Sequence, residues 1–145
     1  MVAERQLADR LAIRELAERY ARAVDRRDWE LARALFSDDA VLVGPRFELV
    51  GRDAILRGLR SVERYRATFH AVTNQLVEIA GDEASGETYC LASHLFERDG
   101  AARKLDWGIR YQDRYRRVDG AWRIARRELV VDFEQELPLA APTAR

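Results

Sequence analysis

The chain has 145 residues, 48% of them apolar, and its 25 basic and 25 acidic residues cancel. This length fits one domain with a real core, and the balanced charge gives no net field that would attract nucleic acid or an anionic membrane. A single cysteine, Cys90, excludes an internal disulfide and a thiolate metal cluster within one chain. Because no apolar run reaches the ~20 residues that span a bilayer, and residues 1–6 lack a secretory signal pattern, we expect a soluble, cytoplasmic protein with no membrane partner.

Helical signals dominate the first half of the chain. Apolar residues recur at close to helical spacing from Leu7 and Leu11 to Val24, which predicts one stripe facing a core. Asp28 and Asp53 each precede a helical pattern and are typical N-caps. We therefore expect three helices, with two short strands before the third: helices at residues 5–25, 29–36 and 54–64, and strands at 40–43 and 47–50.

The second half alternates between β-branched segments and turn signals, of which Asp119-Gly120 is the strongest. Four long strands are expected, at residues 69–80, 84–97, 103–118 and 122–133. Helices followed by a meander of antiparallel strands indicate an α+β domain over residues 1–137, with one curved, mostly antiparallel sheet packed on three N-terminal helices around a pocket. Residues 138–145, which include two prolines, are expected to form a mobile tail.

Asp25 occupies a position that is unfavourable for a carboxylate. It lies at the C-terminal end of the first helix, where a carboxylate meets the negative end of the helix dipole at a cost of roughly 0.3–1 kcal/mol. Asp28 has a structural explanation as an N-cap, but Asp25 has none, and such positions are often functional. The alternative is that Arg26 and Arg27 offset its charge at the surface.

Three segments resemble the SnoaL-like branch of the nuclear transport factor 2 superfamily. They are Arg19-Tyr20 through Asp28-Trp29 to Leu35-Phe36-Ser-Asp-Asp-Ala40, Gly51-Arg-Asp-Ala-Ile55, and Tyr115-Arg-Arg-Val-Asp-Gly-Ala-Trp122. The similarity runs from about residue 8 to residue 133. It implies a cone-like α+β barrel with a mostly apolar pocket, in a superfamily that includes dehydratases, isomerases, cyclases, epoxide hydrolases and non-catalytic modules.

The site pattern is similar to those of scytalone dehydratase, the bile-acid dehydratases and hexachlorocyclohexane dehydrochlorinase. This resemblance implies that Asp25 orients His70 and that His94 matches a second histidine of the site. Tyr20 matches a tyrosine of the bile-acid dehydratases, and Arg127 resembles a positively charged pocket residue of the dehydrochlorinase. The ketosteroid isomerases place their aspartate base elsewhere, at a position that is Gly44 here, which argues against a steroid isomerase of the usual mechanism.

The residues themselves support acid–base chemistry. A neutral imidazole with a pKa near ~6.5 can act as a base, and a carboxylate on its other nitrogen fixes its tautomer. Strand alternation predicts two sets of residues that share a face: His70 with Val72, Asn74 and Leu76, and His94 with Cys90, Ala92 and Phe96. Trp107, Tyr111, Asn74 and Arg127 are the expected substrate contacts. The alternatives are that the histidines are hydrogen-bonded core residues, or that both hold a metal together with a carboxylate; the resemblance implies neither metal nor cofactor.

The favoured function is a cofactor-free lyase of the dehydratase type. Its small hydrophobic substrate would be polyketide, aromatic or steroid-like, with His70 as base, Asp25 as its orienter, Tyr20 as oxyanion stabiliser and His94 as proton donor. There are two alternatives. One is an isomerase or cyclase that uses the same dyad, and the other is a non-catalytic binding or oligomerisation domain. The last strands also suggest a homo-oligomer, a dimer or trimer, because arginines interleave with apolar residues there: Arg110, Arg114, Arg116, Arg123 and Arg126.

Overall fold

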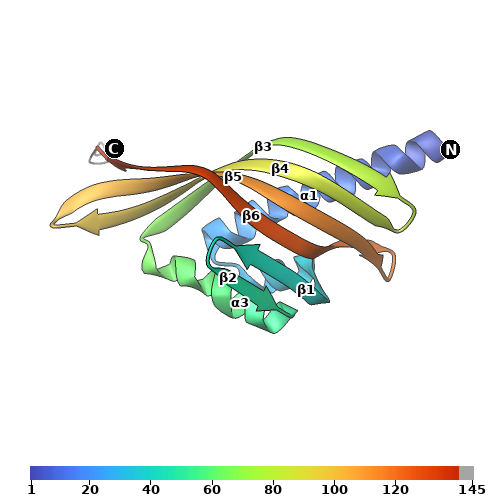
Figure 1. Ribbon diagram of the computed structural model, residues 1–145, viewed down its shortest axis with the longest axis horizontal. Helices are drawn as coiled ribbons and strands as arrows, with labels where there is room; N and C mark the ends of the chain where they lie inside the picture. Colours follow the sequence, from blue (N-terminus) through green and yellow to red (C-terminus); the bar gives the residue numbers. More distant parts are fainter. Residues whose placement is uncertain (141–145) are drawn as a thin grey trace.

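The structure, a computed structural model, describes residues 1–140, which form three α-helices, a 3-10 helix and one six-stranded sheet (Figure 1). In chain order the elements are α1 (Val2–Arg26), α2 (Trp29–Leu35), β1 (Phe36–Gly44), β2 (Phe47–Val50), α3 (Arg52–Leu59), η1 (Arg60–Arg64), β3 (Ala67–Ala80), β4 (Glu83–Arg98), β5 (Ala101–Val118) and β6 (Ala121–Pro138). This arrangement confirms the expected α+β class and the cone-like shape.

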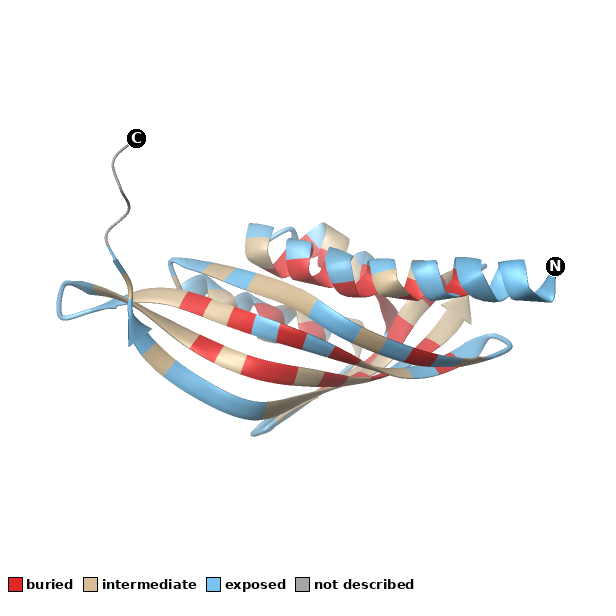
Figure 2. Cartoon of the chain, turned by 90° about the horizontal axis from the view of Figure 1, so that it is seen from above, coloured by how far each residue is buried: buried red, intermediate tan, exposed pale blue. Residues whose placement is uncertain are grey.

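One curved sheet has the strand order β2-β1-β6-β5-β4-β3 and wraps around the helices. The β1 and β6 strands run parallel, and every other neighbouring pair is antiparallel, as expected for a mostly antiparallel sheet. The core lies between α1 and the inner face of the sheet, where Ile13, Val24, Phe36, Tyr111 and Ile124 are buried. Figure 2 shows the buried positions of α1 on the side that faces the strands.

The first turns of α1 differ from the prediction. Leu7 and Leu11, expected on the buried stripe, are 59% and 62% exposed. Both views show the start of this helix at the far end of the β3–β4 hairpin, where little of the sheet lies beneath it (Figures 1 and 2). Helical spacing identified the correct face, but only the later turns have a sheet to pack against. Within residues 1–140, no helix is both long and apolar enough to cross a bilayer.

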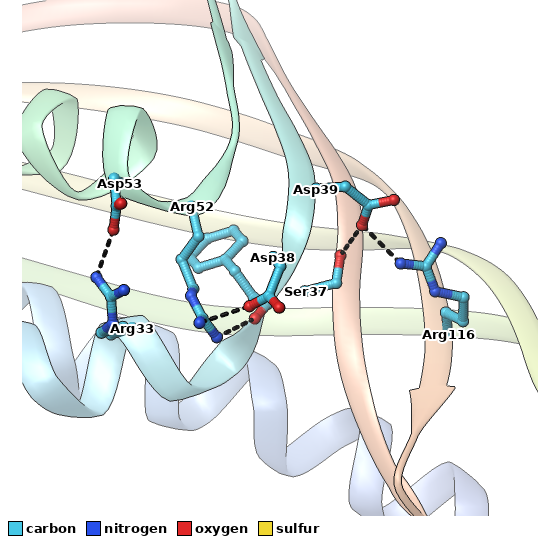
Figure 3. A network of polar contacts seen from close by, with 8 residues as sticks. Arg33, Ser37, Asp38, Asp39, Arg52, Asp53 and Arg116 are labelled. Carbon is cyan, nitrogen blue, oxygen red and sulfur yellow. Dashed lines mark hydrogen bonds and ion pairs between the residues drawn. The ribbon is translucent and has the colours of Figure 1, made fainter.

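The segment after α2 is a strand rather than the end of a helix. Phe36 is already extended and begins β1, which is therefore longer than the predicted strand at residues 40–43. Polar side chains hold this acidic segment in place (Figure 3). Asp39 accepts hydrogen bonds from Ser37 Oγ at 3.0 Å and from Arg116 Nη2 at 2.6 Å, and Asp38 pairs with Arg52 at 2.5 Å.

The third helix and the last strand also differ in extent. The helix predicted over residues 54–64 is divided into α3 and the 3-10 helix η1. Its N-cap is Gly51, and Asp53, predicted as the cap, instead accepts a hydrogen bond from Arg33 at 2.6 Å. The β6 strand continues past the predicted end at residue 133 to Pro138, because it pairs with the far end of β5. Most of the tail predicted at residues 138–145 lies outside the described residues, which end at residue 140.

The outer face of the sheet carries both apolar and charged side chains. Phe69, Leu91 and Phe133 are exposed at 66%, 40% and 53%. Arg110, one of the arginines expected at a subunit interface, pairs with Asp132 of its own chain at 2.6 Å. The homo-oligomer stays a prediction.

Candidate active site

Asp25 reaches from the last turn of α1 to the beginning of β3. Its Oδ1 accepts hydrogen bonds from Nδ1 of His70 at 2.7 Å and from Oγ1 of Thr68 at 2.9 Å, and its Oδ2 accepts one from the backbone N–H of His70 at 2.8 Å. The side chain of His70 is only 7% exposed and that of Asp25 is 22% exposed. The carboxylate of Asp25, which is unfavourable at the C-terminal end of a helix, therefore has its hydrogen-bond partners on β3. It is not paired with Arg26 or Arg27, the alternative that the sequence left open.

These contacts determine the tautomer of His70 and favour the ionised form of Asp25. A carboxylate can only accept, so Nδ1 of His70 carries the hydrogen and Nε2 is left as the acceptor in the neutral ring. Burial opposes the charge on Asp25, but the hydrogen bonds from His70 and Thr68 outweigh it and hold the pKa of this carboxyl below its usual range. The pair is thus a carboxylate that fixes an imidazole in the tautomer suited to a general base.

His94 lies on β4 with its ring centroid 6.3 Å from that of His70. Its Nδ1 donates to the backbone carbonyl of Leu105 at 3.0 Å, which leaves Nε2 as the acceptor. The ring is in contact with those of Tyr65 and Trp107, at centroid distances of 4.8 and 4.9 Å. Burial lowers the pKa of His94, with the nearby His70 as a smaller cause, so the ring is neutral near pH 7.

Tyr20 connects the histidines to a buried ion pair. Its ring lies edge-on to His70 and to Tyr111, at 6.4 and 5.7 Å between centroids. The guanidinium carbon of Arg127 is 4.3 Å from the centroid of Tyr20 and 3.9 Å from that of Tyr111. Burial raises the pKa of Tyr20, so its phenol remains protonated and can donate a hydrogen bond.

Arg127 is held by Asp113 through two parallel hydrogen bonds of 2.8 Å. The two side chains are 1% and 0% exposed, so this charge pair is fully desolvated. Desolvation disfavours the charge on Arg127, but the carboxylate of Asp113 outweighs it and keeps the pKa of the guanidinium well above its usual value. Since Asp113 neutralises this charge, the buried pair as a whole carries no net charge.

Two buried N–H donors of this region have no hydrogen-bond partner within the described residues. They are Nη1 of Arg127 and Nε1 of Trp107. An unsatisfied buried donor costs about 1–3 kcal/mol, so unpaired groups of this kind need an explanation. A bound ligand that accepts hydrogen bonds would supply one.

Strand alternation placed some site residues correctly and others wrongly. On β4, Cys90, Ala92 and His94 are all buried, as predicted. On β3, the pairing register shifts between Val72 and Gln75, and such a bulge reverses the face of every later residue. Asn74 is consequently exposed, and Leu76 is 81% exposed, so the prediction that they share a face with His70 is wrong.

Asp25 and His70 line a groove of about 370 Å³ between α1 and β3, together with Glu18, Arg22 and Val72 among others. A larger cleft of about 690 Å³ lies between Arg10 of α1 and residues of β3 to β6, and neither Asp25 nor His70 lines it. We place the site at the pair because the chemistry-bearing groups gather there. Across residues 1–140, no group of three or more His, Cys, Asp and Glu side chains is arranged to hold a metal ion.

Sequence reasoning missed three residues of this region. Thr68 supports Asp25 and could have been found, because it lies two positions before His70 on the same strand. Asp113 could also have been found, as a carboxylate on the buried face between two tyrosines of β5. Tyr65, which packs on His94, follows a helix and gave no signal in the sequence.

Known proteins of similar sequence and structure support the description of the fold. A model of the SnoaL-like domain matches residues 5–128. An uncharacterised protein of Mycobacterium tuberculosis is 30% identical over 132 residues, which cover 88% of each chain. A solved structure from Novosphingobium aromaticivorans, provisionally named a scytalone dehydratase, has a TM-score of 0.84 and 27% identity over 99% of this chain and 98% of its own. A hexachlorocyclohexane dehydrochlorinase from Novosphingobium barchaimii shares the fold, with a TM-score of 0.79 and 23% identity over 94% of each chain.

Proposed function

Because the chain belongs to the SnoaL-like family, we propose that it is a cofactor-free lyase of the dehydratase type, acting on a small, largely apolar hydroxy-carbonyl compound. The observation that carries this proposal is the 2.7 Å contact between Asp25 Oδ1 and His70 Nδ1. It joins a carboxylate of lowered pKa to an imidazole whose other nitrogen is available as a base. The similarity to proteins named as dehydratase and dehydrochlorinase, both names for eliminations, supports it.

The reaction begins with proton abstraction. Nε2 of His70 takes a proton from the carbon next to the substrate carbonyl, and Asp25 stabilises the imidazolium that forms. The electron pair of the broken C–H bond moves toward the carbonyl oxygen, which becomes an enolate. The ring of Tyr20 lies edge-on to that of His70 and its phenol is protonated, so in this proposal it donates a hydrogen bond to that oxygen.

Elimination follows from the enolate. The electron pair returns to form a carbon–carbon double bond, and the C–O bond to the β-hydroxyl breaks. The leaving oxygen takes the proton from the imidazolium of His70, directly or through His94, and departs as water. His70 is thereby returned to its neutral form, so the step is balanced without a cofactor. General acid–base assistance of this kind contributes typically about 10²–10⁴-fold per group.

The test uses a β-hydroxy ketone fused to an aromatic ring, 3-hydroxy-1-tetralone, as the first member of a small panel. Mass spectrometry should show loss of one water with the wild-type protein, and His70→Gln and Asp25→Asn should lower the rate to background. Asp28→Asn, which keeps an N-cap of equal quality, is the matched control and should react like wild type. A product of unchanged mass would identify an isomerase instead, and dehydration that survived both dyad variants would refute the mechanism.

A further inference from the structure

We propose that Nε1 of Trp107 and Nε2 of His94 together bind the hydroxyl group that the substrate loses. This inference rests on the proposed function and names the leaving group that the site selects. It assigns to Trp107 a hydrogen-bonding role, in addition to the apolar wall expected of its ring.

The three tryptophans of the chain differ in whether the indole N–H has a hydrogen-bond acceptor. The indole N–H of Trp29 donates to Glu63 at 2.9 Å, and that of Trp122 donates to Asp9 at 2.9 Å. The indole N–H of Trp107 is buried and has no partner within residues 1–140. Because a buried indole N–H normally finds an acceptor, this one indicates a partner that comes from outside the chain.

The neighbour of Trp107 supplies the complementary group. The rings of Trp107 and His94 are 4.9 Å apart between centroids and inclined by 59°. The backbone carbonyl of Leu105 accepts from Nδ1 of His94, so Nε2 of the neutral ring is an acceptor. A donor and an acceptor thus lie on two rings in contact, on adjacent strands, where Trp107 pairs with Ala92 and lies diagonally across from His94 on the same face of the sheet.

A hydroxyl group suits such a pair because it both donates and accepts. Its O–H would donate to Nε2 of His94 while its oxygen accepts from Nε1–H of Trp107. A carbon-bound halide could only accept and would leave His94 unpaired, and a protonated amine could only donate and would leave Trp107 unpaired. A site that hydrogen-bonds a substrate hydroxyl discriminates strongly against analogues that lack it. The pair therefore favours a β-hydroxyl leaving group over a halide.

The binding role can be tested apart from turnover by ¹⁵N–¹H NMR of the indole N–H groups. The probes are 2-tetralol, which carries the hydroxyl but no carbonyl and so cannot be dehydrated by this route, 2-chlorotetralin and tetralin. The signal of Trp107 is assigned by its disappearance in Trp107→Phe. We expect 2-tetralol to move this signal downfield, tetralin to leave it near its starting position, and 2-chlorotetralin to have the smaller effect of the two substituted probes. The signals of Trp29 and Trp122, whose N–H groups are already paired, are internal controls.

Affinity gives a second readout. Trp107→Phe keeps an aromatic ring but removes the N–H, so the Kd of 2-tetralol should rise about fivefold, as expected for one hydrogen bond of roughly 1 kcal/mol, while that of tetralin should not change. An indole signal that does not respond to 2-tetralol, an equal response to all three probes, or no binding of 2-tetralol at millimolar concentration would each overturn the inference. The outcome is separable from the proposed function, because a responding indole with no dehydration would leave the hydroxyl subsite standing and remove the lyase.

Discussion

Replacing Asp25 by asparagine should destabilise the protein far more than replacing Asp28. The carboxylate of Asp25 accepts three hydrogen bonds, two from His70 and one from Thr68. An amide has one oxygen, so in either orientation one N–H of the variant faces an N–H of His70. If the amide nitrogen faces the ring, this repulsion is relieved only when His70 takes the other tautomer, in which Nε2 carries the hydrogen and cannot act as a base.

The magnitude follows from these contacts. A hydrogen bond to a charged group contributes about 1.5–3 kcal/mol, and a buried donor left unpaired costs about 1–3 kcal/mol. We therefore expect Asp25→Asn to lower the free energy of unfolding by about 3 kcal/mol. In a chain of this size each kcal/mol lowers Tm by roughly 2–4 °C, which gives a decrease of about 6–12 °C.

Differential scanning calorimetry at pH 7 is the assay, with Asp28→Asn as the control. Asp28 caps α2 by accepting from the backbone N–H of Leu31 at 3.0 Å, and asparagine caps equally well, so its free energy of unfolding should remain within about 0.5 kcal/mol of wild type. The contribution of Asp25 should also disappear in acid: its folded pKa lies below the unfolded value of about 3.9, so the stability it provides is present above that pH and is lost as the pH falls through the folded pKa. Equal Tm values for the two variants would refute this reasoning.

Three further predictions concern His94, the buried ion pair and two glycines. Because the folded pKa of His94 lies below its unfolded value of about 6.5, wild-type Tm should fall as the pH drops below that value, and His94→Gln should show a shallower fall in the same melting series. Asp113→Asn leaves a buried guanidinium without its counter-ion and should cost about 3–5 kcal/mol in urea unfolding, whereas Asp132→Asn, which breaks an exposed pair, should leave the midpoint almost unchanged; equal effects would contradict the assigned burial. Gly86→Ala would bring a Cβ to 2.7 Å from a backbone carbonyl oxygen and should cost about 1–3 kcal/mol, while Gly108→Ala meets only an exposed aromatic ring that can swing aside; thermal melts that rank the glycines the other way would contradict this packing.

Local patterns in the sequence predicted the helices and strands, and together with the family resemblance they predicted the pair of Asp25 and His70. Helical spacing, cap residues and Gly-containing turns predicted the order of helices and strands, because these signals act within a few residues. Asp25 was recognisable because its position at a helix C-terminus is unfavourable by itself, and the resemblance to the SnoaL-like family provided His70 as its partner. Their contact at 2.7 Å agrees with that expectation.

Features set by long-range packing could not be predicted. The register shift after Val72 depends on how β3 meets β4, and it moves Asn74 away from the inner face. Leu7 and Leu11 continue the helical pattern, but the sequence does not show where the sheet beneath them ends. The contact of Tyr65 with His94 likewise depends on the path of the chain after η1.

Proton abstraction by His70 can be followed as deuterium uptake by a ketone that carries no leaving group. In D₂O, the hydrogens on the carbon next to the carbonyl of 1-tetralone exchange slowly for deuterium without a catalyst. NMR follows this exchange, and no leaving group is needed. We expect the wild-type protein to accelerate this exchange, and His70→Gln and Asp25→Asn both to return it to the solvent rate. Exchange that the wild type does not accelerate, or that either variant accelerates as well as wild type, would contradict this expectation.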